Sequence, residues 1–476
     1  MVFDIIILED RKGEFMSKNV WLKYDDNDKE MLNKLCNEYR EYISLNKTER
    51  ENVETVINTV ESLGYKDLEY YINSNEGLKA GDKVYVNNRN KSIALFVIGK
   101  DDITNGMNIL GAHIDSPRLD LKAMPLYEDS ELCYLDTHYY GGIKKYQWLT
   151  LPLALHGVVV KKDGTKVNIC IGENEQDPVV GITDLLPHLG KKQMEKDAGT
   201  FIEGEGLDIL VGSVPYTPVD KDEKDLVKKN LLDILKNRYD ISEDDFLSAE
   251  IEVVPAGKAR NFGLDQSMIM AYGQDDKVCA YASLRAFLDV EECNKTISCI
   301  LVDKEEIGSV GATGMQSSFY EDAVMEICEL LSKYNLTATS RVLKNSKMLS
   351  SDVNAAYDPL YSDVMDKRNS SYFNQGVVFC KYTGSRGKSD SNDADAEFIA
   401  EIRNVMDNNN VYYQFSELGK VDAGGGGTIA YVLANKNVSV IDCGVAVLSM
   451  HAPWEVTAKA DIYEAYKCYK AFLKDM

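Results

Sequence analysis

The amino-acid sequence predicts an α/β protein whose mostly parallel sheet carries helices on both faces and is interrupted by a β-rich insertion. Apolar strand-like segments alternate with amphipathic helical segments before residue 124 and again after residue 256, which is typical of a parallel sheet. Residues 124–256 are instead dominated by strand-like segments. We therefore expect a discontinuous α/β domain, residues 16–123 and 257–476, and an inserted domain, residues 124–256.

The N-terminal part begins with two expected helices and two strand regions. The first helix lies within Asp28–Leu45, and the second starts at Thr48, where Glu51 three residues later completes a capping-box pattern. Val84–Val97 is typical of a β-hairpin, and Met107–Ile114 of a buried strand.

The remaining elements follow from the same periodicities. In the insertion we expect a hairpin at Leu151–Ile171 and a helix at Lys224–Asn237. After it, the expected helices are Asp275–Val290, Phe319–Leu331, Asp393–Met406, Thr428–Ala434 and Ala460–Leu473. The expected strands are Thr296–Val302, Val377–Tyr382, Val411–Phe415 and Val438–Asp442.

Composition excludes several classes of function. The 476 residues carry a net charge of -24, so the surface repels nucleic acid and anionic membranes. No apolar run approaches the ~18–20 residues that span a bilayer. The ten cysteines include no Cys-x-x-Cys pair, which is typical of reduced thiols in a cytoplasmic protein.

The first 15 residues are expected to be a non-native leader. Val2–Leu8 has no basic flank and no cleavage site, so it is a poor signal peptide. Gly13-Glu14, just before Met16, can be encoded by a sequence resembling a bacterial ribosome-binding site. We expect translation to start at Met16; the alternative is a short apolar arm that docks on the fold.

His113 and Asp115 lie two residues apart at the end of a buried strand. They therefore point the same way, so the carboxylate can accept from one ring nitrogen while the other meets a metal. Ligands of open α/β sheets collect beyond the carboxyl ends of the strands. Taken alone, a buried histidine with a hydrogen-bond partner is the simpler interpretation.

Further acidic residues and a histidine occupy similar positions. Asp275-Asp276 opens a helix, where capping is the ordinary explanation. Glu305-Glu306 and Asp352 each follow an apolar strand, and His451 follows an apolar segment. Together with His113 they suit two Zn²⁺ ions, or Mn²⁺ or Co²⁺, ~3.5–4 Å apart with one bridging carboxylate. Glu305, left without a metal, is then the candidate general base.

The order of these segments resembles the aspartyl aminopeptidase and aminopeptidase I family of dinuclear zinc exopeptidases. The most specific matches are Gly111–Arg118, Asp303–Gly314 and Ser449–Pro453. The resemblance covers nearly the whole chain from about Met16, and it implies the zinc-exopeptidase fold with an inserted dimerisation domain.

The resemblance also implies roles for the individual residues. Asp115 orients His113, and Glu305 is the base. Asp275 bridges the metals, although a one-residue register leaves Asp276 as the alternative. The implied ligand pairs are His113 with Asp352 for one metal, and Glu306 with His451 for the other.

The inserted domain carries His188, which by itself is typical of an exposed loop. In the family that the sequence resembles, this domain forms dimers and a histidine from it reaches the active site of the partner. The dimers build a closed tetrahedral dodecamer. An imidazole in that position could donate a hydrogen bond to a tetrahedral oxyanion.

The expected function is therefore removal of single N-terminal residues from peptides by two-metal-activated water attack. The alternatives are a related two-metal carboxypeptidase or deacylase, and an inactive peptide-binding scaffold. The complete set of ligands and base argues against the scaffold. Val353–Asp358 contains no histidine, which favours the family branch that accepts neutral residues, and Lys381 is the candidate partner for an acidic one.

Overall fold

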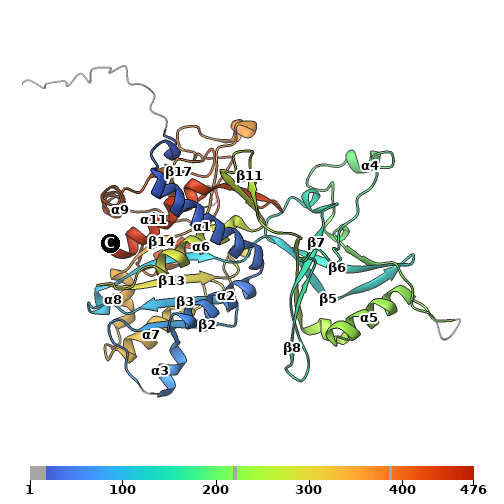
Figure 1. Cartoon of the computed structure of the whole chain (residues 1–476), viewed down its shortest axis with the longest axis horizontal. Helices are drawn as coiled ribbons and strands as arrows, with labels where there is room; N and C mark the ends of the chain where they lie inside the picture. The colour runs from blue at the N-terminus through green and yellow to red at the C-terminus, as the bar shows by residue number, and fades with distance from the viewer. Residues whose placement is uncertain (1–17, 75, 218–221, 385–388) are drawn as a thin grey trace, which may run out of the picture.

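The structure is a computed structural model that describes residues 18–74, 76–217, 222–384 and 389–476. The expected leader, residues 1–15, lies outside the described residues. Figure 1 shows two lobes: a larger one with layered helices and strands, and a smaller one built around the strands β5 to β8. Among the described residues, no helix is long and apolar enough to cross a bilayer.

The larger lobe contains a nine-stranded sheet in the order β1-β2-β3-β13-β4-β14-β18-β16-β17. Its centre is parallel and consists of β13 (Thr296–Val302), β4 (Met107–His113), β14 (Lys347–Ser350) and β18 (Ser439–Gly444). Its flanking strands are β1 (Lys66–Asp67), β2 (Lys83–Asn88), β3 (Ser92–Val97), β16 (Val377–Cys380) and β17 (Tyr413–Ser416).

The sheet is mixed: the expected parallel arrangement is present in the four central strands and in the outer pairs β1–β2 and β16–β17, but not throughout. Strand β3 is antiparallel to both β2 and β13, and β16 is antiparallel to β18. The β2–β3 pair must be antiparallel because a tight hairpin turn cannot join parallel neighbours. Arg89 and Asn90 make that turn with positive φ angles of 60° and 57°.

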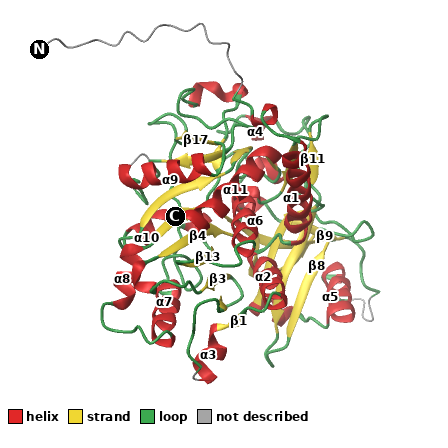
Figure 2. Ribbon diagram, turned by 60° about the vertical axis from the view of Figure 1, so that its left-hand side comes forward, coloured by secondary structure: helices red, strands yellow, loops and turns green. Residues whose placement is uncertain are grey.

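Helices cover both faces of this sheet. Alternate residues of β3 enter two separate cores, Leu95 on one face and Phe96 on the other, as the period of a strand requires. One core is covered by α1 (Asp26–Leu45), α2 (Glu49–Ser62), α6 (Gln274–Leu288), α9 (Ala396–Asn408) and α11 (Lys459–Asp475). The other is covered by α3 (Leu68–Ser74), α7 (Phe319–Leu330), α8 (Ala338–Asn345) and α10 (Ala430–Ala434). Figure 2 shows α6 and α11 on one side of β4 and β13, with α7 and α8 on the other.

The smaller lobe is an antiparallel six-stranded sheet in the order β8-β7-β10-β5-β6-β9. It has its own buried core, which includes the fully buried Trp148. Its strands are β5 (Arg118–Asp129), β6 (Leu132–Tyr140), β7 (Leu153–Val160), β8 (Lys166–Ile171), β9 (Ile209–Gly212) and β10 (Ala249–Pro255). Its helices are α4 (Lys191–Met194) and α5 (Leu226–Tyr239).

A third, five-stranded sheet in the order β11-β12-β20-β19-β15 lies against the larger lobe. It matters for function because the turn between β19 and β20 carries His451. Its strands are β11 (Arg260–Phe262), β12 (Met268–Ala271), β15 (Asn354–Ala355), β19 (Ala446–Leu448) and β20 (Glu455–Ala458).

A buried ionic cluster joins the start of α2 to the smaller lobe. His156 on β7 lies between two carboxylates, with Nδ1 2.7 Å from Glu51 and Nε2 3.1 Å from Glu173. Lys47 adds an ion pair of 2.5 Å to Glu173. Burial disfavours the imidazolium, but the two carboxylates outweigh it and raise the pKa of His156 to about 9. His156 therefore stabilises the contact between the lobes.

Candidate metal centre

The predicted acidic and histidine residues meet at one edge of the sheet because the three central strands β13, β4 and β14 run in the same direction. His113 ends β4, and Glu305-Glu306 form a short 3₁₀ turn after β13. Asp352 follows β14 by two residues, and Asp275 lies in the first turn of α6. Two sets of ligand atoms lie within 4.8 Å of one another: His113, Glu305 and Asp352, and His113, Asp275 and Glu306.

Asp275 lies between the two histidines and presents one oxygen to each. Its Oδ1 is 3.1 Å from Nε2 of His113, and its Oδ2 is 3.2 Å from Nε2 of His451. Glu306 Oε2 is 3.5 Å from the same nitrogen of His451. This arrangement gives one carboxylate access to two neighbouring positions for a cation.

The second nitrogen of each imidazole has a protein partner. Nδ1 of His113 lies 3.1 Å from the carbonyl oxygen of Asp115 and 3.3 Å from its carboxylate. Nδ1 of His451 lies 2.9 Å from the carbonyl oxygen of Gly142. A carbonyl accepts only from a protonated nitrogen, so both rings keep Nε2 free to bind a metal.

Asp115 does more than orient the histidine, the role the sequence suggested for it. Its carboxylate also accepts hydrogen bonds from the backbone amides of Glu305 and Glu306, at 3.1 and 3.2 Å. A further hydrogen bond of 2.8 Å comes from the hydroxyl of Tyr140. The buried carboxylate of Asp115 therefore holds the segment after β4 against the Glu305-Glu306 turn after β13.

Three residues near the centre were missed by the sequence analysis. Tyr140 is the last residue of β6 in the smaller lobe and Gly142 follows it by two residues, where the sequence alone favours a tight turn with packed aromatics. Glu455 on β20 accepts from the backbone amides of Asp275, at 3.0 Å, and of His451, at 2.8 Å. Most of their partners lie far away in the chain, since Tyr140 contacts Asp115, Gly142 contacts His451 and Glu455 contacts Asp275, so a local pattern does not mark them.

Asp276 differs from Asp275 in what it contacts. Its Oδ2 accepts a hydrogen bond of 3.3 Å from the backbone amide of His113. Its other oxygen is buried and has no hydrogen-bond partner among the described residues. Asp276 therefore faces the backbone of β4, whereas Asp275 faces the imidazoles.

The charges in this cluster are unbalanced. Burial raises the pKa of Glu306 and of Asp352 well above the usual range, and neighbouring carboxylates add to the effect. Burial also raises the pKa of Glu305 to about 7. Burial opposes the charge on His113 as well, but hydrogen bonds to Asp115 and Asp275 raise its pKa.

The donor set fits divalent cations. Buried carboxylates need compensating positive charge, and imidazole nitrogens with carboxylate oxygens are ligands that zinc takes in catalytic sites. Oε1 of Glu306 is buried without a hydrogen-bond partner among the described residues, so it has a free lone pair to offer.

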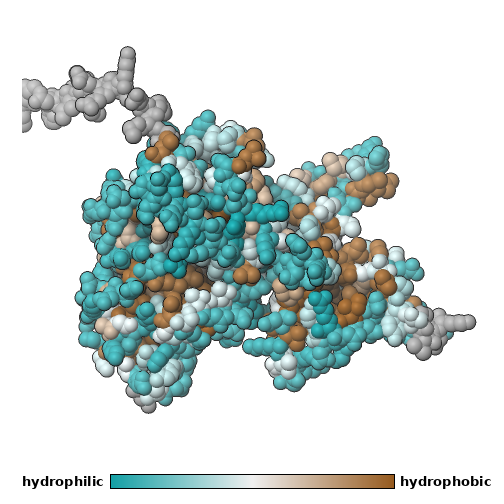
Figure 3. Space-filling model, viewed as in Figure 1, coloured by the Kyte–Doolittle hydropathy of each residue, from teal (hydrophilic) through white to brown (hydrophobic). Residues whose placement is uncertain are grey.

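His188 is not brought to this cluster within one chain. It lies in an exposed loop just before α4, and Figure 1 places α4 at the far side of the smaller lobe from β14. The surrounding apolar side chains are Leu185, Leu186, Leu189 and Met194, which are 46%, 49%, 67% and 71% exposed. Figure 3 shows hydrophobic surface over the α4 region. We call these four residues and His188 the α4 patch.

An α/β sheet with imidazoles and carboxylates gathered at the carboxyl ends of its central strands defines a metallohydrolase type of centre. Residues 42–473 match the family model of the aminopeptidase I zinc metalloproteases, M18. The chain therefore belongs to the M18 family of zinc metalloaminopeptidases.

Similar proteins agree over nearly the full length. A probable M18 family aminopeptidase 1 from Clostridium acetobutylicum is 57% identical over 458 residues, covering 96% of this chain and 98% of that protein. The crystal structure of an M18 aminopeptidase from Thermotoga maritima is 44% identical, with a TM-score of 0.92 and coverage of 97% and 100%. That of aminopeptidase I from Clostridium acetobutylicum is 54% identical, with a TM-score of 0.90 and coverage of 96% and 99%.

Proposed function

We propose that this chain removes single N-terminal residues from peptides with two divalent metal ions, Zn²⁺ in the first place and Mn²⁺ or Co²⁺ as alternatives. The observation that carries the proposal is the position of Asp275, whose two oxygens lie 3.1 and 3.2 Å from the imidazoles of His113 and His451. A carboxylate between two nitrogen ligands is suited to bridge two cations.

The family resemblance and the clustering of the side chains support the remaining ligands. His113 and Asp352 would hold one ion, Glu306 and His451 the other, and Asp275 both. Asp276 is less suited to bridge because one of its oxygens already accepts from the backbone of β4. When bound, the ions would lower the pKa of a water and polarise the peptide carbonyl.

Glu305 would move the proton. Its Oε2 lies 3.9 Å from Nε2 of His113, so it borders the centre. It would accept a proton from the attacking water and deliver that proton to the nitrogen of the departing amine. Asp115 would hold the Glu305-Glu306 turn in place through the two backbone amides.

The test separates an aminopeptidase from its alternatives. We expect cleavage of peptides with a free N-terminus, no cleavage of their N-acetylated forms, and loss of activity with a chelator that added Zn²⁺ restores. Equal cleavage of both peptide forms would contradict the aminopeptidase and point to a carboxypeptidase. Release of acetate would indicate a deacylase, and no cleavage with metal bound would indicate a scaffold.

We also propose a preference for neutral N-terminal residues. The segment after Asp352 lacks histidine, and Lys381 is half-buried with its ammonium 4.9 Å from the Tyr382 ring. Rates on peptides beginning with Asp, Glu, Leu or Lys test this. A strong preference for Asp or Glu that Lys381→Met abolishes would contradict it.

We further propose self-association through residues 124–256 as a dimerisation domain, with 16–123 and 257–476 forming the catalytic domain. The exposed apolar side chains of the α4 patch support an interface there. A structure described as the yeast mApe1 dodecamer is 22% identical, with a TM-score of 0.74. We propose the same tetrahedral dodecamer for this chain, with the partner's His188 donating to the oxyanion.

Sedimentation tests the assembly. Leu186→Asp with Leu189→Asp should dissociate it, whereas Leu264→Asp, at a residue 107% exposed elsewhere, should not. A wild-type monomer would contradict the proposal.

The ten cysteines are all free, which supports a reducing compartment, and we propose the cytoplasm.

A further inference from the structure

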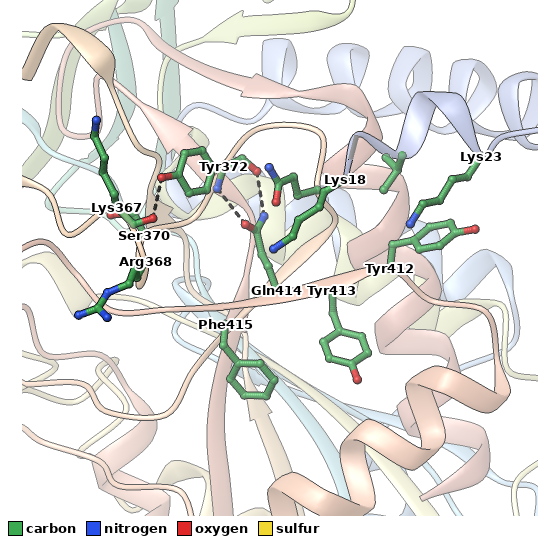
Figure 4. A pocket seen from close by; sticks show the side chains of 12 residues that line it. Lys18, Lys23, Lys367, Arg368, Ser370, Tyr372, Tyr412, Tyr413, Gln414 and Phe415 are labelled. Atoms are coloured by element: carbon green, nitrogen blue, oxygen red, sulfur yellow. Dashed lines mark hydrogen bonds between the residues drawn. The ribbon is translucent and has the colours of Figure 1, made fainter. Parts of the chain in front are cut away.

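A cavity of about 670 Å³ lies at the β17 margin of the larger lobe, away from the metal centre (Figure 4). Its walls are the 3₁₀ turn η1 (Val20–Leu22), the segment 367–375 and strand β17. None of the predicted metal ligands lines it. The lining residues are Lys18, Val20, Lys23, Lys367, Arg368, Ser370, Tyr372, Gln375, Tyr412, Tyr413, Gln414 and Phe415.

The lining has the opposite charge to the rest of the chain. It contains four cations and no carboxylate, although the chain has 77 acidic and 53 basic residues. None of the four cations forms an ion pair with a residue that the structure describes; Lys23 instead lies 4.3 Å over the ring of Tyr412. Figure 4 shows lysines from η1 and from the segment 367–375 on opposite sides of Gln414. We call these four residues, Lys18, Lys23, Lys367 and Arg368, the cationic pocket.

The cavity is built by hydrogen bonds and needs no ligand to form. The amide of Gln414 accepts from the backbone of Tyr372 at 2.9 Å and donates to its carbonyl at 2.8 Å. The turn η1 is held by Asn374, whose carbonyl accepts from the amide of Val20 at 2.8 Å. The side chain of Asn374 accepts from the indole of Trp21 at 2.9 Å. A preformed wall lowers the entropic cost of binding.

The position on the sheet points to a peptide rather than a small anion. Strand β17 is the last strand of the sheet and pairs only with β16 among the described residues. An edge strand can pair with an added extended chain, while flanking pockets receive its side chains. Phe415 on β17 is 37% exposed beside the cations, so apolar contact is available as well.

We propose that the cationic pocket binds an extended peptide segment that carries several carboxylates. Cations on opposite sides of Gln414 (Figure 4) complement such a chain along its length, whereas a small anion such as phosphate spans only part of that length. A peptide is favoured over nucleic acid because an extended peptide backbone can pair with the open edge of β17, whereas a phosphate backbone cannot. The proposal is independent of the metal chemistry, since it uses none of those residues.

The experiment measures binding of an N-acetylated, fluorescein-labelled hexaglutamate by fluorescence anisotropy to the full chain. Acetylation protects this probe from the proposed aminopeptidase activity. The double variant Lys367→Met with Arg368→Met should bind about tenfold more weakly, because each exposed charge contributes modestly. The control, Lys162→Met with Lys166→Met in the β7–β8 hairpin, removes the same charge from an exposed surface elsewhere and should bind like wild type.

Other outcomes would overturn the proposal. Equal affinity of the pocket variant and wild type would show that the peptide binds elsewhere. If inorganic phosphate displaces the probe when both supply the same concentration of negative charge, the pocket is a general anion site and does not recognise a peptide. A pocket variant that changes sedimentation but not probe binding would assign this face to a second copy of the chain. Cleavage of a short neutral peptide should be unchanged in both variants, which separates this test from that of the proposed function.

Discussion

Replacing Tyr140 by phenylalanine removes one hydroxyl and leaves the ring in place. The hydroxyl donates a 2.8 Å hydrogen bond to Asp115, and the ring lies 3.9 Å from the guanidinium of Arg118. Both side chains of the hydrogen bond are buried, with Tyr140 9% exposed and Asp115 1% exposed. The substitution therefore tests one contact between the smaller lobe and the metal centre.

The expected magnitude follows from the number of donors around Asp115. Three donors remain after the substitution: the imidazole of His113 and the amides of Glu305 and Glu306. A hydrogen bond to a charged group is worth about 1.5–3 kcal/mol. Since residues that support a metal ligand typically change metal affinity 10–100-fold, we expect a loss of about tenfold in affinity with the fold intact.

The assay is a competition for Zn²⁺ between the protein and a chromophoric chelator, accompanied by thermal unfolding. The control is Tyr139→Phe, because Tyr139 is the neighbouring tyrosine on β6 and is 44% exposed. If Tyr140→Phe loses stability but keeps wild-type zinc affinity and turnover, the hydroxyl supports the fold and does not position the centre.

Four further predictions follow from the site and the lobe contact. Glu305→Gln should keep its metal and lose ~10²–10⁴-fold in turnover; near-normal turnover with metal bound would exclude it as the base. Asp275→Asn should lose metal by elemental analysis, and full occupancy would point to Asp276. The raised pKa of His156, about 9 against ~6.5 unfolded, means its stabilisation is complete below about pH 6.5 and lost as the pH rises through about 9. His156→Gln should therefore lower the melting temperature at pH 6 and have little effect near pH 10; an equal effect at both would refute this. His188→Ala should assemble but lose turnover, and reassembly with Glu305→Gln should restore part of it; a remixed sample that stays inactive would contradict donation between subunits.

The positions of the candidate ligands could be predicted because each has a local signal. His113 ends an apolar strand, and Glu306 and Asp352 come shortly after one; the parallel direction of β13, β4 and β14 brings those ends together. The sequence also identified the capping box of α2, in which Thr48 and Glu51 exchange hydrogen bonds. Contacts between residues that are close in sequence produce a local pattern, so they can be predicted from the sequence alone.

Other features depend on contacts that no local pattern records. Glu455 and Tyr140 reach the centre from another sheet and another lobe, and the sequence around them does not indicate a role there. The choice between Asp275 and Asp276 depends on the direction of the backbone at the start of α6. Helix α9 begins later than expected because Asp395 caps it, accepting from the amide of Phe398 at 2.8 Å.

The spread of the proposed ligands along the chain has a consequence for biosynthesis. The first is residue 113 and the last is residue 451 of 476, and β4 is followed by the whole smaller lobe before the next ligand appears. The imidazole of His451 is synthesised only after all the other proposed ligands, and it must then clear the exit tunnel of the ribosome. A nascent or prematurely terminated chain consequently carries an incomplete centre. Such a chain lacks a proposed metal ligand and should not hydrolyse other peptides. The order of synthesis would therefore delay peptidase activity until the fold is complete.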